Sequence, residues 1–205
     1  INLQRGMAEE SENFFRGIPE KTVSGDPWLL TPGPLTTSLT VKEAMLHDVG
    51  SRDNHFIEVN RNILNKLIQL AGAEATHVAV PMQGSGTFIV EAMFGTLVPR
   101  DGKVLILSNG VYGKRMAKIC QYLNREFDLI DGPENLPVNF TDLESLLRKD
   151  KKITHVAMTH CETTAGVLNP VEEVGEIVKR HGRKLLIDSM SAFGSIPIQY
   201  TQVAF

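Results

Sequence analysis

The sequence has little cysteine, no long apolar run and no excess of charge of either sign. Its two cysteines, Cys120 and Cys161, lie in no CxxC pair and in no His/Cys cluster with the spacing of zinc ligands. No apolar run approaches the roughly 20 residues that cross a bilayer. With 21 basic and 24 acidic residues the formal net charge is -3, which argues against nucleic acid or an anionic membrane as the main partner. We therefore expect a cytoplasmic protein without a metal site, in which Cys120 is a buried thiol because it lies in an apolar helical pattern.

The remaining composition is that of an ordinary globular domain. Of the 205 residues, 42% are hydrophobic and 22% are charged, which is enough for one sizeable core. Residues 1–27 are polar and are predicted to form an N-terminal arm, or a linker from a preceding domain. The chain starts at Ile1 rather than Met, so we do not expect this residue to be the start of translation. One domain is predicted from residue 28 to residue 205.

Short apolar runs and amphipathic runs alternate along this domain. The alternation is typical of βαβ units, and therefore of a mostly parallel sheet with helices on both faces. The predicted fold class is thus a doubly wound α/β sheet, which binds ligands beyond the carboxyl ends of its strands. The predicted strands are 76–82, 103–108, 126–130, 154–159 and 184–188, and the predicted helices are 56–70, 87–97, 113–123, 142–148 and 171–181; on the first helix the apolar face comprises Val59, Ile63, Leu64, Leu67 and Leu70.

Two of the segments that follow predicted strands have the composition of a ligand site. Residues 83–87 read Gln-Gly-Ser-Gly-Thr; glycines at a helix start let N–H groups converge on a phosphate, and Ser85 and Thr87 add hydroxyl donors. The alternative is an ordinary tight turn with a Ser or Thr cap. After the next strand the ring of Tyr112 can stack on a planar ligand, although by itself it is better explained as a cover for the edge of the core.

Two further strand ends carry polar side chains. The segment 159–166 is polar and ends in glycine, as a ligand loop does, and the hydroxyl of Thr163 can donate to a phenolate-like oxygen. His160 is a candidate general base, but a structural histidine is the favoured interpretation because no partner is evident. Asp188 follows three apolar residues, where a lone carboxylate is costly to bury unless it is paired. Its partner is a metal, a base or a protonated ring nitrogen, and the alternative is a helix N-cap.

Together these four strand ends offer a phosphate cradle, a stacking ring, a hydroxyl loop and a carboxylate. Pyridoxal phosphate (PLP) has a phosphate arm, a flat ring, a ring oxygen and a ring nitrogen, and so it satisfies all four. An Asp that pairs with the pyridinium N–H keeps the ring positively charged, which makes PLP an effective electron sink. The sequence therefore predicts PLP as the cofactor.

At these residues the chain resembles class V, fold-type I aminotransferases, and within them the branch that acts on 2-aminoethylphosphonate. The resemblance runs from about Trp28 to Tyr200. Its most branch-specific stretch is Thr-Pro-Gly-Pro-Leu-Thr-Thr at residues 31–37. The other stretches are 83–87, 108–115, 160–166 and 188–194.

The resemblance implies a role for each matching residue. The cofactor residues would hold the phosphate, stack on the ring, bond near the phenolic oxygen and pair with the ring nitrogen; they are Ser85, Gly86 and Thr87, then Tyr112, Thr163 and Asp188, in that order. The substrate residues would border the substrate; they are Pro32, Gly33 and Pro34, with Arg52 as a weaker candidate for binding an anionic group.

The resemblance also implies a reaction and an assembly. The reaction is amino-group transfer from 2-aminoethylphosphonate to pyruvate, giving phosphonoacetaldehyde and alanine. In this fold type the active site lies between two subunits, so a homodimer is expected of the intact protein. The lysine that anchors the cofactor is expected on a later strand, beyond Phe205. On this basis we expect the chain to be a large-domain fragment that lacks the C-terminal small domain, binds PLP poorly and does not turn over.

Four alternatives remain open from the sequence. An alanine– or serine–glyoxylate aminotransferase has similar motifs. A cysteine desulfurase is disfavoured because that group stacks a histidine where Tyr112 stands. A non-catalytic remnant of the fold is favoured by the absent lysine and opposed by the retained ligand positions. A Rossmann dehydrogenase is the weakest, because the glycine fingerprint is incomplete and Ser108 ends the second predicted strand where an acidic residue is required.

Overall fold

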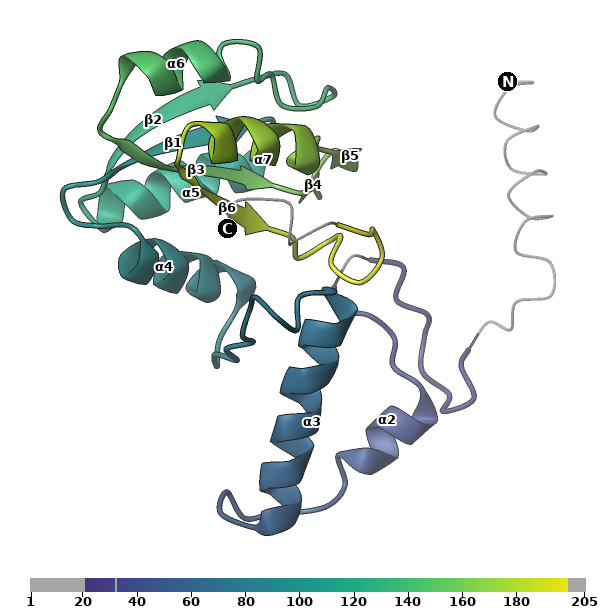
Figure 1. Ribbon diagram of the computed structural model, residues 1–205. Coiled ribbons are helices and arrows are strands. Elements are labelled where there is room, and N and C mark those ends of the chain that lie inside the picture. The colour runs from purple at the N-terminus through teal and green to yellow at the C-terminus, as the bar shows by residue number, and fades with distance from the viewer. Residues whose placement is uncertain (1–20, 32, 199–205) are drawn as a thin grey trace, which may run out of the picture. The chain divides into compact units, whose positions relative to one another are not determined.

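The computed structural model describes residues 21–31 and 33–198 (Figure 1). They belong to two compact units, Ile1–Gly50 and Ser51–Phe205. The predicted boundary after residue 27 falls inside the first unit, and the first 20 residues of the predicted arm lie outside the described residues. The division into an arm and a domain at that boundary stays a prediction.

The described part of the first unit is a short extended segment followed by one helix, α2 (Leu39–Ala44). Ser38 caps this helix by accepting a hydrogen bond from the Val41 N–H, as a serine at that position typically does. Lys42 forms an ion pair with Asp26 at 3.0 Å. The Ser24 hydroxyl and the Lys42 ammonium together hold the pKa of Asp26 below its usual value.

The second unit is built on a parallel sheet in the order β2-β1-β3-β6. All three neighbouring pairs are parallel, which confirms the predicted α/β class. Between β3 and β6 the chain also makes a small antiparallel hairpin, β4-β5, in the segment predicted as a ligand loop. The strands are β1 (Lys103–Ser108), β2 (Glu126–Asp131), β3 (Ile153–Thr159), β4 (Cys161–Glu162), β5 (Val167–Leu168) and β6 (Lys184–Asp188).

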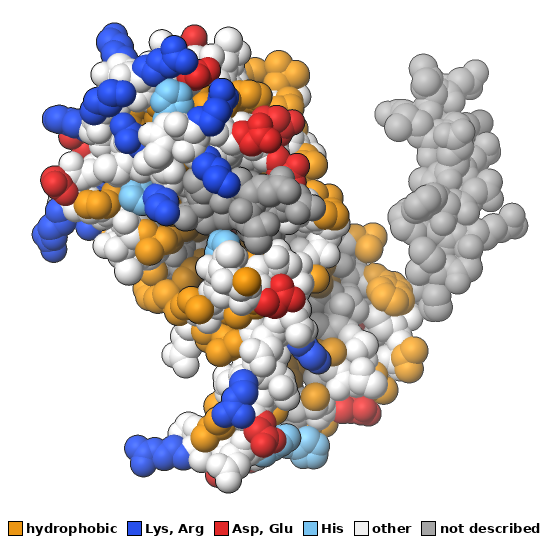
Figure 2. Space-filling model, viewed as in Figure 1, with side chains coloured by type: hydrophobic (Ala, Val, Ile, Leu, Met, Phe, Trp, Pro, Cys, Tyr) orange, Lys and Arg blue, Asp and Glu red, His pale blue; other side chains and the backbone are white. Residues whose placement is uncertain are grey.

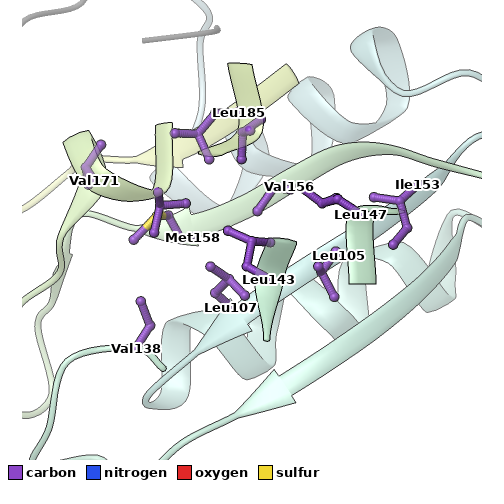
Figure 3. Packing of buried hydrophobic residues seen from close by; sticks show 12 residues of the cluster. Leu105, Leu107, Val138, Leu143, Leu147, Ile153, Val156, Met158, Val171 and Leu185 are labelled. Atoms are coloured by element: carbon purple, nitrogen blue, oxygen red, sulfur yellow. The ribbon is translucent and has the colours of Figure 1, made fainter. Parts of the chain in front are cut away.

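Helices cover both faces of this sheet (Figure 1). Side chains alternate along β1, so Leu105 and Leu107 join one buried cluster while Val104 and Ile106 join the other. The first cluster is shown in Figure 3 and packs the sheet against α6 and α7. The second packs it against α4 and α5. The helices of this unit are α3 (Asn54–Leu70), α4 (Gly86–Leu97), α5 (Val111–Tyr122), α6 (Leu143–Lys149) and α7 (Val171–Arg180).

The strand predicted at 76–82 is wrong, since the structure has no strand in this segment. The side chains of Val78 and Val80 are 81% and 70% exposed. A short apolar run is compatible with a strand, but the strand forms only where a neighbour pairs with its N–H and C=O groups. Among the described residues, no strand pairs with this run, so its composition alone was misleading.

The predicted helix at 56–70 is confirmed as α3, but its predicted apolar face is not a core face. Leu64 is half-buried, whereas Ile63, Leu67 and Leu70 are exposed. Hydrophobic side chains are accordingly visible at the surface in Figure 2. Amphipathic periodicity indicates which side of a helix favours burial, and it does not supply the surface that covers it. Among the described residues, no helix has the length and apolarity needed to cross a membrane.

The amino ends of the strands are joined by a charge cluster around Lys103. Its ammonium lies 2.7 Å from Asp128 and 3.0 Å from Asp150, and its side chain is only 12% exposed. The hydrogen bond to Asp128 is the main cause that raises the pKa of Lys103, and Lys103 in turn lowers the pKa of Asp150. The cluster ties β1 to β2 and to Asp150, the C-cap of α6, at the edge opposite the carboxyl ends.

We predict that Lys103→Met lowers the free energy of unfolding by about 1 kcal/mol at pH 7, because two carboxylates lose their shared cation. The lowered pKa of Asp150 means that its stabilising contribution is present above the usual carboxyl pKa and is lost as the pH falls through the lowered one. The raised pKa of Lys103 means that the stabilising contribution of this lysine is lost only as the pH rises through the raised pKa. Urea unfolding should therefore give a constant difference between roughly pH 5 and 10, and a difference that persists unchanged at pH 2 would contradict the pairing.

We also predict that Cys120 is inert in the native chain. The side chain is 0% exposed, and burial raises the pKa of its thiol to about 11, so little thiolate exists at pH 8. A Cys161→Ser variant, whose remaining thiol is Cys120, should not react with a disulfide reagent until it is unfolded in urea. The Cys120→Ser variant, which keeps the half-buried Cys161, is the matched control. Rapid reaction of Cys120 without denaturant would show that the core is open.

Candidate functional site

The start of α4 is the predicted phosphate cradle, residues 83–87. Gly84 has φ +132°, and a Cβ there would lie 2.7 Å from Phe88 Cδ1, so the turn requires glycine at this position. Ser85 is the N-cap of the helix, and its hydroxyl accepts from the Phe88 N–H at 3.2 Å. The cap that the sequence offered as an alternative is therefore present. Its acceptor role still leaves the hydroxyl hydrogen and the helix N–H groups available as donors.

An arginine that sequence reasoning missed joins this turn to the predicted stacking residue. Arg115 Nη1 donates to the Thr87 hydroxyl at 3.1 Å, and the guanidinium carbon lies 4.7 Å from the centroid of the Tyr112 ring. Tyr112 and Arg115 are three residues apart on α5, so they share a helix face. That spacing is the signal that identifies Arg115. The guanidinium of Arg115 therefore lies between the Thr87 hydroxyl and the Tyr112 ring.

The start of α5 is held by a fully buried carboxyl group, that of Glu162 on β4. Its Oε1 accepts from the Tyr112 N–H at 3.4 Å and from the Thr164 hydroxyl at 2.7 Å. Gly110 makes room for it, since a Cβ at that position would lie 2.5 Å from Glu162 Cδ. No local sequence pattern predicts this contact, because it joins residues about fifty positions apart.

The segments after β3 and β6 meet through hydroxyl groups. The hydroxyl of Thr163, the predicted partner of the phenolic oxygen, is hydrogen-bonded to the hydroxyl of Ser191. His160 is 3% exposed, and its Nδ1 lies 3.0 Å from the Ser189 hydroxyl. Burial lowers the pKa of His160, and the opposing effect of Glu172 is smaller. His160 therefore has a structural partner and favours the neutral imidazole, as the structural interpretation expected.

Asp188 ends β6, opposite Thr159 in the parallel register. Its Oδ1 accepts from the Met190 N–H at 3.1 Å, and its carbonyl accepts from the His160 N–H at 2.8 Å. Among the described residues, no hydrogen bond reaches Oδ2. Asp188 is half-buried, so this oxygen remains available to a ligand. Met190 in turn lies 3.8 Å from the position of a Cβ on Gly86.

These contacts form a closed circuit of predicted cofactor residues. Thr87 is joined to Tyr112 through Arg115, and Tyr112 to the Thr163 segment through Glu162. Thr163 is joined to the Asp188 segment through Ser191. Met190 of the same segment lies beside Gly86, 3.8 Å from where a Cβ of that residue would be. The structure therefore brings together the six residues predicted for the cofactor, which are Ser85, Gly86, Thr87, Tyr112, Thr163 and Asp188.

Two buried amide side chains, those of Asn109 and Asn169, lie next to the ends of β1 and β3. Asn109 and Asn169 exchange hydrogen bonds at 3.0 and 3.1 Å, and Asn169 also bonds the carbonyl of Thr159 at 3.0 Å. Further bonds reach the Leu136 carbonyl and the Val138 N–H. Both side chains are almost fully buried and satisfied, as a buried amide must be. The pair fixes the ends of β1 and β3 relative to each other.

Of the predicted substrate residues, Arg52 lies in the same unit as this circuit and is not part of it. Arg52 is exposed, and no hydrogen bond or ion pair of its side chain is present among the described residues. Gly33 and Pro34 lie in the first unit, and Pro32 lies outside the described residues. Their roles stay predictions.

A pocket of about 330 Å³ lies elsewhere, between the end of α3 and the segment after β6. Its lining has no titratable side chain, so it lacks the groups that acid–base chemistry requires. The lining residues are Gln69 to Gly72 and Phe193 to Ile198.

We predict that Gly84→Ala lowers the free energy of unfolding by about 1–3 kcal/mol, because an L-residue is strained at this φ and its Cβ meets Phe88. Gly86→Ala is the matched control two residues away. Its Cβ would make only ordinary contacts with Met190, so we expect a change within about 1 kcal/mol. Urea unfolding of both variants tests this, and equal losses would contradict the special conformation of Gly84.

Comparison with known proteins identifies the family to which the chain belongs. The family model for "Aminotransferase class-V" matches residues 37–204. Among curated proteins, the 2-aminoethylphosphonate–pyruvate transaminase of Pseudomonas aeruginosa strain PAO1 is 52% identical over 184 residues, which are 90% of this chain and 50% of that protein. The enzyme of the same name from Pseudomonas putida strain W619 is 50% identical over 183 residues, 89% of this chain and 50% of that protein. The chain spans about half the length of these relatives.

Solved structures agree on the fold. The pyridoxamine–pyruvate aminotransferase of Mesorhizobium loti has a TM-score of 0.76 at 24% identity, covering 84% of this chain and 44% of that one. The alanine–glyoxylate aminotransferase of Nostoc sp. has a TM-score of 0.75 at 28% identity, covering 85% of this chain and 46% of that one. Pyridoxal phosphate is the cofactor that these relationships imply. With a family match over most of its length and a circuit of contacts at the carboxyl ends of its strands, the chain belongs to the class-V aminotransferases.

Proposed function

We propose that the protein to which this chain belongs transfers the amino group of 2-aminoethylphosphonate to pyruvate, giving phosphonoacetaldehyde and alanine. The observation that carries the proposal is the roughly one-half identity, over nine-tenths of the chain, to relatives that bear this name. It is supported by the circuit of contacts that joins the residues predicted to hold the cofactor. A glyoxylate-accepting aminotransferase or a non-catalytic remnant is less supported, because the curated relatives at about one-half identity reported above bear the name of the phosphonate enzyme.

The donor set fits pyridoxal phosphate. The start of the 12-residue helix α4 offers N–H groups and the hydroxyls of Ser85 and Thr87, and the guanidinium of Arg115 lies beside Thr87. Such a helix start with an adjacent cation suits a phosphate. At the other side, one oxygen of Asp188 accepts from the Met190 N–H while the other stays available. A carboxylate with one oxygen already oriented suits a ring N–H.

Each of these residues then has a proposed task. Ser85, Gly86 and Thr87 bind the phosphate, which fixes the distance of the ring from α4. Tyr112 stacks on the ring and sets its plane, while Thr163 donates near the phenolic oxygen. Asp188 accepts a hydrogen bond from the protonated ring nitrogen and so keeps the ring cationic. When bound, PLP supplies an electron sink that stabilises the negative charge left on the substrate carbon after a proton is removed.

The substrate side rests on residues outside this circuit. Pro32, Gly33 and Pro34 are proposed to border the substrate, and Arg52 is proposed as a weaker contact for its anionic group. Among the described residues, no hydrogen bond joins a lysine to Thr87, Tyr112, Thr163 or Asp188. Lys114, which is close in sequence to Tyr112, is ion-paired with Asp131 and Glu134 instead. The anchoring lysine is therefore proposed to lie outside the described residues.

We further propose a homodimer in the cytoplasm. The exposed apolar side chains of α3, among them Ile63, Leu67 and Leu70, favour an assembly that covers them. The two cysteines are free thiols, which is consistent with a reducing compartment.

The test is the visible spectrum of the whole gene product mixed with PLP, and then with 2-aminoethylphosphonate alone. We expect the bound cofactor to convert to pyridoxamine phosphate with the donor alone, and to return on addition of pyruvate with formation of alanine. Asp188→Asn keeps the shape of the side chain but not its charge, so we expect conversion at least about 100-fold slower with the phosphate affinity retained.

The controls separate the alternatives. Conversion by alanine or serine but not by 2-aminoethylphosphonate, with return by glyoxylate, would support the glyoxylate branch. Failure of the whole product to bind PLP would overturn the enzyme proposal and leave the remnant.

A further inference from the structure

The carboxyl group of Glu162 is the most deeply buried acidic group of the described residues that the proposed reaction leaves unused. Glu162 is 0% exposed, and its Oε2 is buried without a hydrogen-bond partner among the described residues. Leaving a carboxyl oxygen unsatisfied in the interior is costly. A buried group without a partner calls for a physical explanation, and the other oxygen of this carboxyl group makes contacts with another element.

Those remaining contacts lie at the first turn of α5. The N-cap of this helix is Gly110, which has no side chain to accept from the free N–H groups. Glu162 Oε1 supplies the missing acceptor from another strand, at 3.4 Å from the Tyr112 N–H. The carboxyl group also lies at the positive end of the helix dipole.

The fit between the two elements depends on Gly110. A Cβ there would lie 2.5 Å from both Cγ and Cδ of Glu162, which is closer than any side chain tolerates. The backbone of Gly110 is extended, with φ 170°, so glycine is required for space and not for its dihedral angle. The pair Gly110–Glu162 therefore brings the start of α5 directly onto β4.

The same carboxyl group organises the loop that follows it. Oε1 also accepts from the Thr164 hydroxyl at 2.7 Å, and the Glu162 carbonyl accepts from the Gly166 N–H at 2.8 Å. Between these contacts lies Thr163, whose hydroxyl bonds Ser191. One side chain thus fixes both the residue proposed to stack on the ring and the loop proposed to reach its phenolic oxygen.

We propose that Glu162 is a positioning residue: it holds the backbone of Tyr112 and the Thr163–Thr164 turn in register, so that both meet the ring of the cofactor. The inference rests on the proposed cofactor site. It makes Glu162 more important for contacts with the ring than for contacts with the phosphate, because the cradle is the start of α4 and no hydrogen bond joins α4 to Glu162 in the described residues.

The test compares two ligands of the whole protein. Pyridoxamine 5'-phosphate cannot form an imine with a lysine, so its affinity reports the ring and phosphate contacts alone. Inorganic phosphate reports the cradle alone. Leaving a buried donor without its acceptor typically costs about tenfold in an equilibrium constant, so for Glu162→Ala we expect about tenfold weaker binding of pyridoxamine phosphate, while phosphate binding stays within about twofold. Glu162→Gln keeps an oxygen acceptor and should restore both values, and Glu176→Ala, at an exposed glutamate on α7, is the matched control.

A second measurement needs no ligand. Hydrogen exchange of a peptide that spans Val111 and Tyr112 should be on the order of tenfold faster in Glu162→Ala than in the parent or in Glu162→Gln, because the first-turn N–H loses its acceptor. If Glu162→Ala does not fold, Glu162→Asp retains the carboxyl group but withdraws it from α5, and it should also weaken pyridoxamine phosphate selectively.

The inference is overturned if Glu162→Ala weakens both ligands equally, if it leaves pyridoxamine phosphate binding unchanged, or if Glu162→Gln fails to restore it. If the parent protein binds phosphate but not pyridoxamine phosphate, the proposed function fails instead. Hydrogen exchange at Tyr112 then decides the inference by itself. The inference stands if Glu162→Ala accelerates the exchange, and it is overturned if the exchange rate is unchanged.

Discussion

The seat of α5 against the sheet is the constraint on which the rest of the site depends. Two glycines allow it: a Cβ on Gly110 would meet Glu162 at 2.5 Å, and a Cβ on Gly113 would meet the Ser108 side chain at 2.6 Å. The helix start is thereby pressed between the end of β1 and β4. Tyr112 and Arg115 then extend from a fixed first turn toward Thr87. A larger residue at either glycine would displace the helix, and with it the contacts of its neighbours.

Hydrogen bonds between buried polar groups fix the positions of the strand ends at the site. Asn109 and Asn169 satisfy each other and the backbone around them, which fixes the ends of two strands more narrowly than apolar packing does. Glu162 is satisfied at only one oxygen. The polar groups of the Asn109–Asn169 pair are thus all hydrogen-bonded. The carboxyl group of Glu162, which organises the proposed cofactor contacts, keeps one oxygen without a hydrogen bond.

Stability and proposed chemistry occupy opposite edges of the sheet. At the amino ends Lys103 neutralises the carboxylates of Asp128 and Asp150, where no ligand is proposed. At the carboxyl ends the connections are rich in glycine and hydroxyl groups, and Asp188 keeps one oxygen available. A parallel sheet permits this separation because all of its strands end at the same edge.

The sequence alone determined the elements that depend on local periodicity and the residues that lie at strand ends. The strands at 103–108 and 184–188 match β1 and β6, because buried parallel strands are continuous apolar runs bounded by turns. Tyr112, Thr163 and Asp188 were identified as candidates for the same reason, since position after a strand is visible in one dimension. The run at 76–82 was misread because pairing requires a neighbour that composition does not specify.

Only the tertiary structure decided which of those residues meet, and through what. Arg115 joins Thr87 to Tyr112, Ser191 joins Thr163 to the end of β6, and Glu162 caps a helix that begins some fifty residues earlier in the chain. No local pattern marks such contacts, because they depend on how closely two elements approach, and that distance is set by glycines whose missing side chains have meaning only in three dimensions.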